Sequence, residues 1–156
     1  MRMLLILILL ICFNAYAQVS RQDVLDINTH INSVTNAQLH IEFLEVKGSH
    51  MKLRPHLKKI VIKTELLLGL NNKHEIAMVL AHEHAHTVLG HTLCTLSNET
   101  QADEYSRLIM LKAGYDPVIG SQYWQRMFDL VGESPHNKHH PTNKARAKFY
   151  LTGKWE

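Results

Sequence analysis

Apolar residues recur at two different spacings along the chain. Over residues 20–35 they lie three and four positions apart, which is typical of one face of an amphipathic helix. Over residues 38–47 apolar and polar positions alternate, and residues 59–63 form a β-branched run, so both segments are predicted to be strands. Residues 51–54 fit a short edge strand, because Pro55 has no N–H to donate to a sheet.

The second half of the chain is predicted to be helical. Asn72 and Glu75 fit a capping box at the start of the first of these helices, and Gly90 fits its C-terminal stop. Asp116 and Pro117 fit the cap and first position of a later helix. The expected helices cover residues 72–89, a segment from residue 97 or 98 to Gly114, a segment from Pro117 onwards, and residues 142–151, with a polar loop at 132–138.

These patterns predict an α+β fold, mainly helical, with a small mixed or antiparallel sheet beside the helix at 72–89. The apolar stripe of the helix after Pro117 is expected to consist of Ile119, Tyr123, Met127, Leu130 and Val131. The 156 residues suit one domain. The net charge is +3 and the basic residues are scattered, which argues against a nucleic-acid partner.

The first residues read as a secretory signal peptide. Arg2 precedes a short apolar run, and Ala15-Tyr16-Ala17 fits a small-x-small cleavage site. We therefore expect a signal peptide at 1–17, a mature domain at 18–156 without a stable membrane anchor, and a periplasmic or secreted location; an uncleaved anchor is the alternative. Cleavage would leave a single cysteine, Cys94, for which a buried, apolar environment is expected.

The sequence His82-Glu83-His84-Ala85-His86 carries the candidate chemistry. His82 and His86 are one helical turn apart on one face, so both imidazoles could bind one metal ion. Glu83 lies about 100° round the same helix, where it could act as a general base. Two histidine ligands and a carboxylate base suit a zinc hydrolase. The alternative is a solvated helix face in a chain with 12 histidines.

A third ligand and its support are expected on the next helix. Glu99 would lie in the first turn of that helix, and a short connection would return it to His86. Asp103, one turn deeper, could accept a hydrogen bond from the far nitrogen of a ligand histidine. The alternative is a surface pair of carboxylates near a helix N-terminus, where negative charge is favoured.

In combination these motifs resemble the HtpX and CAAX-prenyl-protease type of zinc metallopeptidase, over roughly residues 38–150. The H-E-x-x-H and E-x-x-A-D helices, residues 113–117, the segment 60–67, and His140-Pro141 followed by Arg146 carry the likeness. The resemblance implies a zincin-like, gluzincin-type site in which the third ligand is a glutamate. Residues 50–56 depart from the family's substrate-docking edge, and the gap between His86 and Glu99 is short.

The resemblance implies a zinc endopeptidase with one Zn²⁺ held by His82, His86 and Glu99, and Glu83 activating a water. His140 and Arg146 are the implied oxyanion donors, and His140 could also reach the zinc as a fourth ligand. Protein or peptide substrates, including unfolded envelope proteins, would be expected. Two alternatives are a catalytically weak zinc-binding or chaperone-like module and a His-rich zinc scavenger. His84 and His91 are expected to be structural or solvated.

Overall fold

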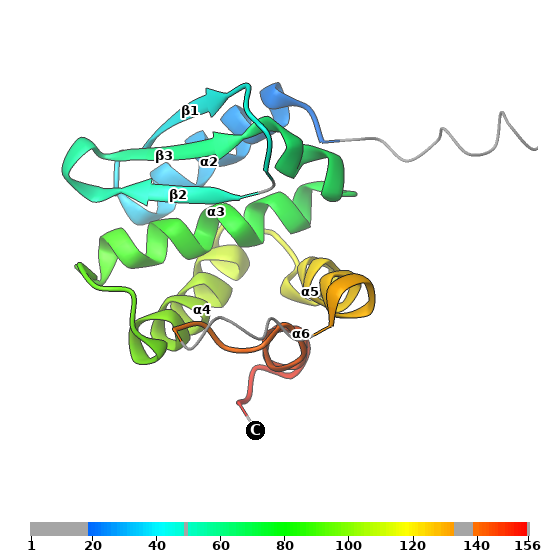
Figure 1. Ribbon diagram of the computed structural model, residues 1–156. Coiled ribbons are helices and arrows are strands. Elements are labelled where there is room, and N and C mark those ends of the chain that lie inside the picture. Colours follow the sequence, from blue (N-terminus) through cyan, green and yellow to red (C-terminus); the bar gives the residue numbers. More distant parts are fainter. Residues whose placement is uncertain (1–18, 49, 133–138, 156) are drawn as a thin grey trace, which may run out of the picture.

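The computed structural model describes residues 19–48, 50–132 and 139–155. The predicted signal peptide and residues 133–138 of the predicted loop lie outside this part. Figure 1 shows an α+β fold in three layers, with the central helix between a small sheet and a group of helices. In chain order the elements are α2 (Arg21–Thr35), β1 (His40–Leu44), β2 (Met51–Arg54), β3 (Lys59–Lys63), α3 (Lys73–Val88), α4 (Leu96–Lys112), α5 (Pro117–Val131) and α6 (Asn143–Thr152), with short 3₁₀ helices at Pro55–Leu57 and Thr64–Gly69.

The sheet is mixed, with the strand order β1-β3-β2. β1 runs parallel to β3, whereas β2 runs antiparallel to β3 and forms an edge, as predicted. β1 is shorter than the predicted segment 38–47 because side chains of α2 bind the backbone before it. Asn32 accepts a hydrogen bond from the Leu39 N–H at 2.7 Å, and Asn28 and Asn32 each donate to the Leu39 carbonyl at 2.8 Å.

Helix α3 is the centre of the molecule. Most of its apolar residues are buried, because α2, α4 and α5 all pack against it and the sheet lies beside it (Figure 1). The apolar residues of α3 that are at most 1% exposed are Ile76, Ala77, Met78, Leu80, Ala81 and Ala85. Side chains on α3 therefore have fixed positions relative to all three layers.

Two local predictions need correction. Asn72 caps α3 as predicted, but Glu75 does not complete a capping box. Its carboxylate instead accepts the N–H of Asn71 at 2.8 Å and pairs with Arg126 of α5 at 2.6 Å, because Glu75 is buried where α5 packs. The predicted stripe of α5 is wrong at its end: Leu130 and Val131 are 78% and 64% exposed, since the last turn of α5 lies at the surface.

Candidate metal centre

Three predicted metal ligands come together in the structure. The Nε2 atoms of His82 and His86 are 3.1 Å apart. Glu99, in the first turn of α4, places Oε2 3.1 Å from His82 Nε2 and Oε1 3.4 Å from His86 Nε2. Thr95 caps α4 one residue before Leu96, so this helix begins slightly earlier than predicted and turns Glu99 back towards α3.

Asp103 holds His82 in one orientation, as the sequence predicted. Its Oδ1 accepts from His82 Nδ1 at 2.9 Å, from Arg146 Nη2 at 2.5 Å and from the Tyr150 hydroxyl at 3.1 Å. Burial alone would raise the pKa of Asp103, but the nearby Arg146 and His82 together have the larger effect and lower the pKa below its ordinary value. The carboxylate therefore stays ionised. A proton on His82 Nδ1 leaves the lone pair of Nε2 directed at Glu99 and His86.

His91 orients the second histidine, a role that the sequence did not reveal. His91 Nδ1 lies 3.0 Å from His86 Nδ1, and His91 Nε2 lies 3.3 Å from Gln101 Oε1. When His91 Nε2 donates a hydrogen bond to Gln101, His91 Nδ1 accepts a hydrogen bond from the N–H at His86 Nδ1. The Nε2 of His86 then also presents a lone pair. The five-residue separation of His86 and His91 gave no signal, because His91 lies beyond the end of α3.

These donors fit a cation. Burial raises the pKa of Glu99, but the neighbouring His140, His82 and His86 hold it well below its usual range, so its carboxylate is charged. Two imidazole lone pairs and a carboxylate facing one another repel unless a positive charge lies between them. Burial lowers the pKa of His82, but Asp103 and Glu99 raise it to about 9, so a proton can supply that charge. A zinc ion would supply it with the donor set that zinc prefers.

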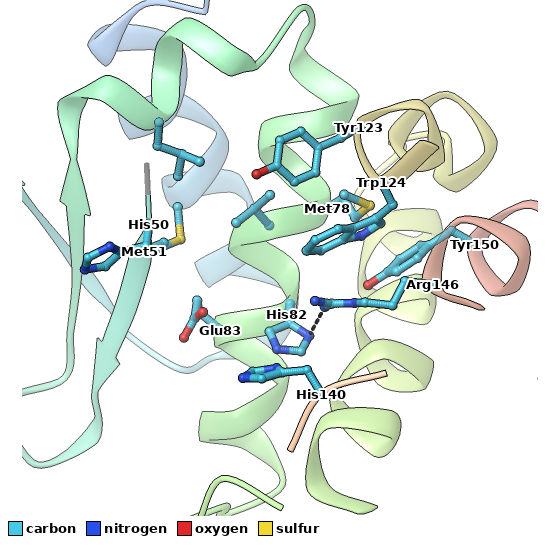
Figure 2. Close-up of a pocket in the computed structure, with 12 residues that line it drawn as sticks. His50, Met51, Met78, His82, Glu83, Tyr123, Trp124, His140, Arg146 and Tyr150 are labelled. Atoms are coloured by element: carbon cyan, nitrogen blue, oxygen red, sulfur yellow. Dashed lines mark hydrogen bonds between the residues drawn. The ribbon is translucent and has the colours of Figure 1, made fainter. Parts of the chain in front are cut away.

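Glu83 lies where two hollows of the surface meet. One, of about 250 Å³, is lined by apolar residues that include Met51, Met78 and Trp124; Figure 2 shows Glu83 and His82 at its edge. The other, of about 440 Å³, extends along β2 towards the α3–α4 connection. Both hollows include Met51, His82, Glu83 and His140. Within the described part of the chain no hydrogen bond or ion pair holds the Glu83 carboxylate, so it is available to a ligand in this cleft.

The two predicted oxyanion donors occupy different surroundings. His140, just before α6, directs Nδ1 at Glu99 Oε2 at 2.7 Å and borders the cleft. Arg146 is buried, lies 3.8 Å from the centroid of the Trp124 ring and places Nη2 3.2 Å from His82 Nδ1 (Figure 2). Arg146 therefore supports His82 through Asp103.

Two further expectations are settled by burial. Cys94 is exposed, which corrects the expected burial, because the α3–α4 connection that carries it lies at the surface. His84 is fully buried and structural: its ring nitrogens lie 2.9 Å from Asn28 Oδ1 and 3.1 Å from Thr35 Oγ1 of α2. Burial lowers the pKa of His84 to about 4, so it is neutral.

Comparison with protein families gives one match. Residues 55–98 match Peptidase family M48. The matched segment is less than a third of the chain; it contains His82, Glu83 and His86 and ends one residue before Glu99. No curated protein and no solved structure matches the chain.

The M48 match supports a metallopeptidase and covers the segment from the end of β2 through α3 to the first residues of α4. M48 enzymes are zinc metallopeptidases, and the largely buried group His82, His86 and Glu99 provides ligand atoms that all lie within 4.8 Å of one another. Outside the matched segment, α4 and α6 contribute Glu99, Asp103 and Arg146 to the same centre.

Proposed function

We propose that this chain is a zinc-dependent endopeptidase. The observation that carries the proposal is the largely buried group of His82, His86 and Glu99, with Asp103 fixing His82 and a Glu83 carboxylate beside it that no other described residue engages, in an open cleft. A zinc ion bound there supplies a Lewis acid that polarises a peptide carbonyl and lowers the pKa of a water.

The residues around the ion have distinct roles in this proposal. Glu83 takes a proton from the attacking water and returns it to the leaving amine, which suits a carboxylate that no hydrogen bond or ion pair within the described residues engages. His140 borders the cleft and is the candidate donor to the oxyanion. Arg146 acts as a positioning residue, because it contacts Asp103 and His82.

The substrate in this proposal is an extended peptide along β2. This strand is at the edge of the sheet and borders both hollows, so it can pair with a peptide backbone. The apolar hollow at Met51, Met78 and Trp124 would receive an apolar side chain on one side of Glu83. The second hollow would receive residues on the other side of the scissile bond, which supports internal cleavage.

We propose further that the enzyme acts after export, on unfolded proteins of the periplasm or the extracellular space. The apolar run and small-x-small site at residues 1–17 support this location. No helix in the described part of the chain has both the length and the apolar character needed to cross a membrane.

The Glu83→Gln variant tests the proposal, because it keeps the shape of the side chain and removes its basicity. We expect the variant to bind as much zinc as the unaltered chain and to cleave unfolded casein at least about 100-fold more slowly. Gln125→Glu, on the exposed face of α5, is a control that should cleave normally. Equal cleavage by the Glu83→Gln variant and the unaltered chain would reject the endopeptidase assignment. A non-catalytic zinc-binding module would then be the better hypothesis.

A further inference from the structure

Cys94, Glu99 and His140 form a second group of metal-ligating side chains beside the first. Their ligand atoms all lie within 4.8 Å of one another. Among the described residues two such groups occur, and Glu99 is the only residue that they share. Cys94 comes from the α3–α4 connection and His140 from the segment before α6, so the group forms only in the folded chain.

The hydrogen bonds of this group leave each residue with one atom that can bind a metal ion. His140 Nδ1 lies 2.7 Å from Glu99 Oε2, so a proton there leaves the lone pair on Nε2. That Nε2 lies 3.6 Å from Cys94 Sγ. Cys94 Sγ in turn lies 3.5 Å from Glu99 Oε1, the oxygen that is not bonded to His140.

The two separations from Cys94 Sγ match edges of a tetrahedral zinc site. With Zn–S near 2.3 Å and Zn–N or Zn–O near 2.0 to 2.1 Å, a tetrahedral angle places sulfur about 3.6 Å from a nitrogen or oxygen ligand. The observed distances from Cys94 Sγ are 3.6 Å to the nitrogen and 3.5 Å to the oxygen. A thiolate, an imidazole and a carboxylate are also the ligand types that zinc takes in proteins.

We infer that Cys94, His140 and Glu99 form a second zinc site, in which the Glu99 carboxylate bridges to the ion held by His82 and His86. Zinc would take the place of the Cys94 thiol proton, which is released to solvent. Cys94 is exposed and His140 partly exposed, so this site opens to solvent and is expected to exchange its metal more readily than the buried one. The inference shares Glu99 and His140 with the proposed function: Glu99 would bridge the two ions, and His140 would not donate to the oxyanion while its Nε2 binds the second ion.

Cobalt titration of the metal-free, full-length chain tests the inference, because cobalt reports thiolate ligation by a charge-transfer band in the near ultraviolet. We expect two cobalt ions per chain by equilibrium dialysis, with this band. The Cys94→Ser variant should bind one cobalt without the band. Cys12→Ser, which changes the other cysteine of the chain, is the matched control and should bind two with the band. His140→Ala should bind one and lose most of the band.

The His82→Ala/His86→Ala variant separates this inference from the proposed function. It should lose the first ion and all peptidase activity but keep one cobalt and the thiolate band. A single cobalt without a thiolate band in the unaltered chain would overturn the second site and leave the peptidase proposal standing. A single cobalt with that band would also overturn it, because Cys94 would then bind the first ion. Circular dichroism and melting temperature establish that each variant is folded.

Discussion

At the residue scale, the site depends on which nitrogen of each histidine carries the proton. Asp103 accepts a hydrogen bond from His82 Nδ1 at 2.9 Å, and His91 Nδ1 lies 3.0 Å from Nδ1 of His86. Both Nε2 atoms then present lone pairs to the same point, 3.1 Å apart. Residues that never touch a metal thus decide whether the two ligands can bind one.

The raised pKa of His82 predicts how the metal-free protein responds to pH. The folded value is about 9, above about 6.5 for an unfolded histidine, so the folded state binds more protons between these values. This contribution to the free energy of unfolding is complete below about pH 6.5 and is lost as the pH rises through 9. We expect a loss of about 3 kcal/mol across this window, measured by urea unfolding in the presence of a chelator.

The His82→Gln variant is the control for this prediction. It lacks the titrating ring, so its free energy of unfolding should change much less between pH 6.5 and 9 than that of the unaltered chain. A metal-free protein that becomes more stable as the pH rises through this window would contradict the raised pKa.

At the scale of elements, each helix that borders the site is fixed by a polar contact at its end. Thr95 caps α4 immediately before the turn that carries Glu99. Glu75, in the first turn of α3, accepts two hydrogen bonds from Arg126 of α5, at 2.6 and 2.7 Å. The Glu75–Arg126 pair therefore joins α3, which carries the two histidine ligands, to α5, which carries Trp124.

Removing Arg126 tests this connection. Glu75 is fully buried, so the Arg126→Met variant would leave its carboxylate with hydrogen bonds from Asn71 and Asn72 but without the ion pair with Arg126. We expect the free energy of unfolding to fall by about 2 to 3 kcal/mol, less than the 3 to 5 typical of a fully buried pair, because the Arg126 side chain is 32% exposed. Chemical denaturation measures the change.

The double variant Arg126→Met/Glu75→Leu is the matched control. It removes the buried charge together with its partner and should recover a large part of the lost stability. A double variant that is less stable than Arg126→Met alone would show that the pair does not act as proposed.

At the scale of the whole molecule, the metal centre joins layers that pack separately. Its ligands come from α3 and α4, and their supporting residues from α4 and α6. The cleft is lined by residues of β2, α3, α5 and α6. An ion bound to α3 and α4 would therefore stabilise the packing on which the cleft depends.

Metal removal should consequently destabilise the whole fold. With free zinc at about 100 times its dissociation constant, binding adds about 2.7 kcal/mol to the free energy of unfolding. We expect chelation to lower the melting temperature in scanning calorimetry. Returning zinc should restore it. In the His82→Ala/His86→Ala variant the shift should be much smaller; an equal shift would place the stabilising metal elsewhere.

The sequence alone determined the features that depend on local spacing. Periodicity located the amphipathic helix α2, a β-branched run located β3, Pro55 marked the end of β2, and capping residues marked the later helices. The four-residue spacings put His82 with His86 and Glu99 with Asp103 on common faces. These predictions succeed because the period of a helix or strand fixes which side chains share a face, whatever the rest of the chain does. The signal peptide and the catalytic roles remain predictions.

Only the tertiary structure decided the contacts between residues far apart in the chain. It placed His91 against His86, Arg146 behind His82, and Cys94 at the surface beside Glu99 and His140, and it gave the carboxylate of Glu75 to Arg126 rather than to a capping box. Burial and partners at such positions depend on how whole elements pack. Periodicity describes one element at a time and carries no information about which side chain of another element will face it.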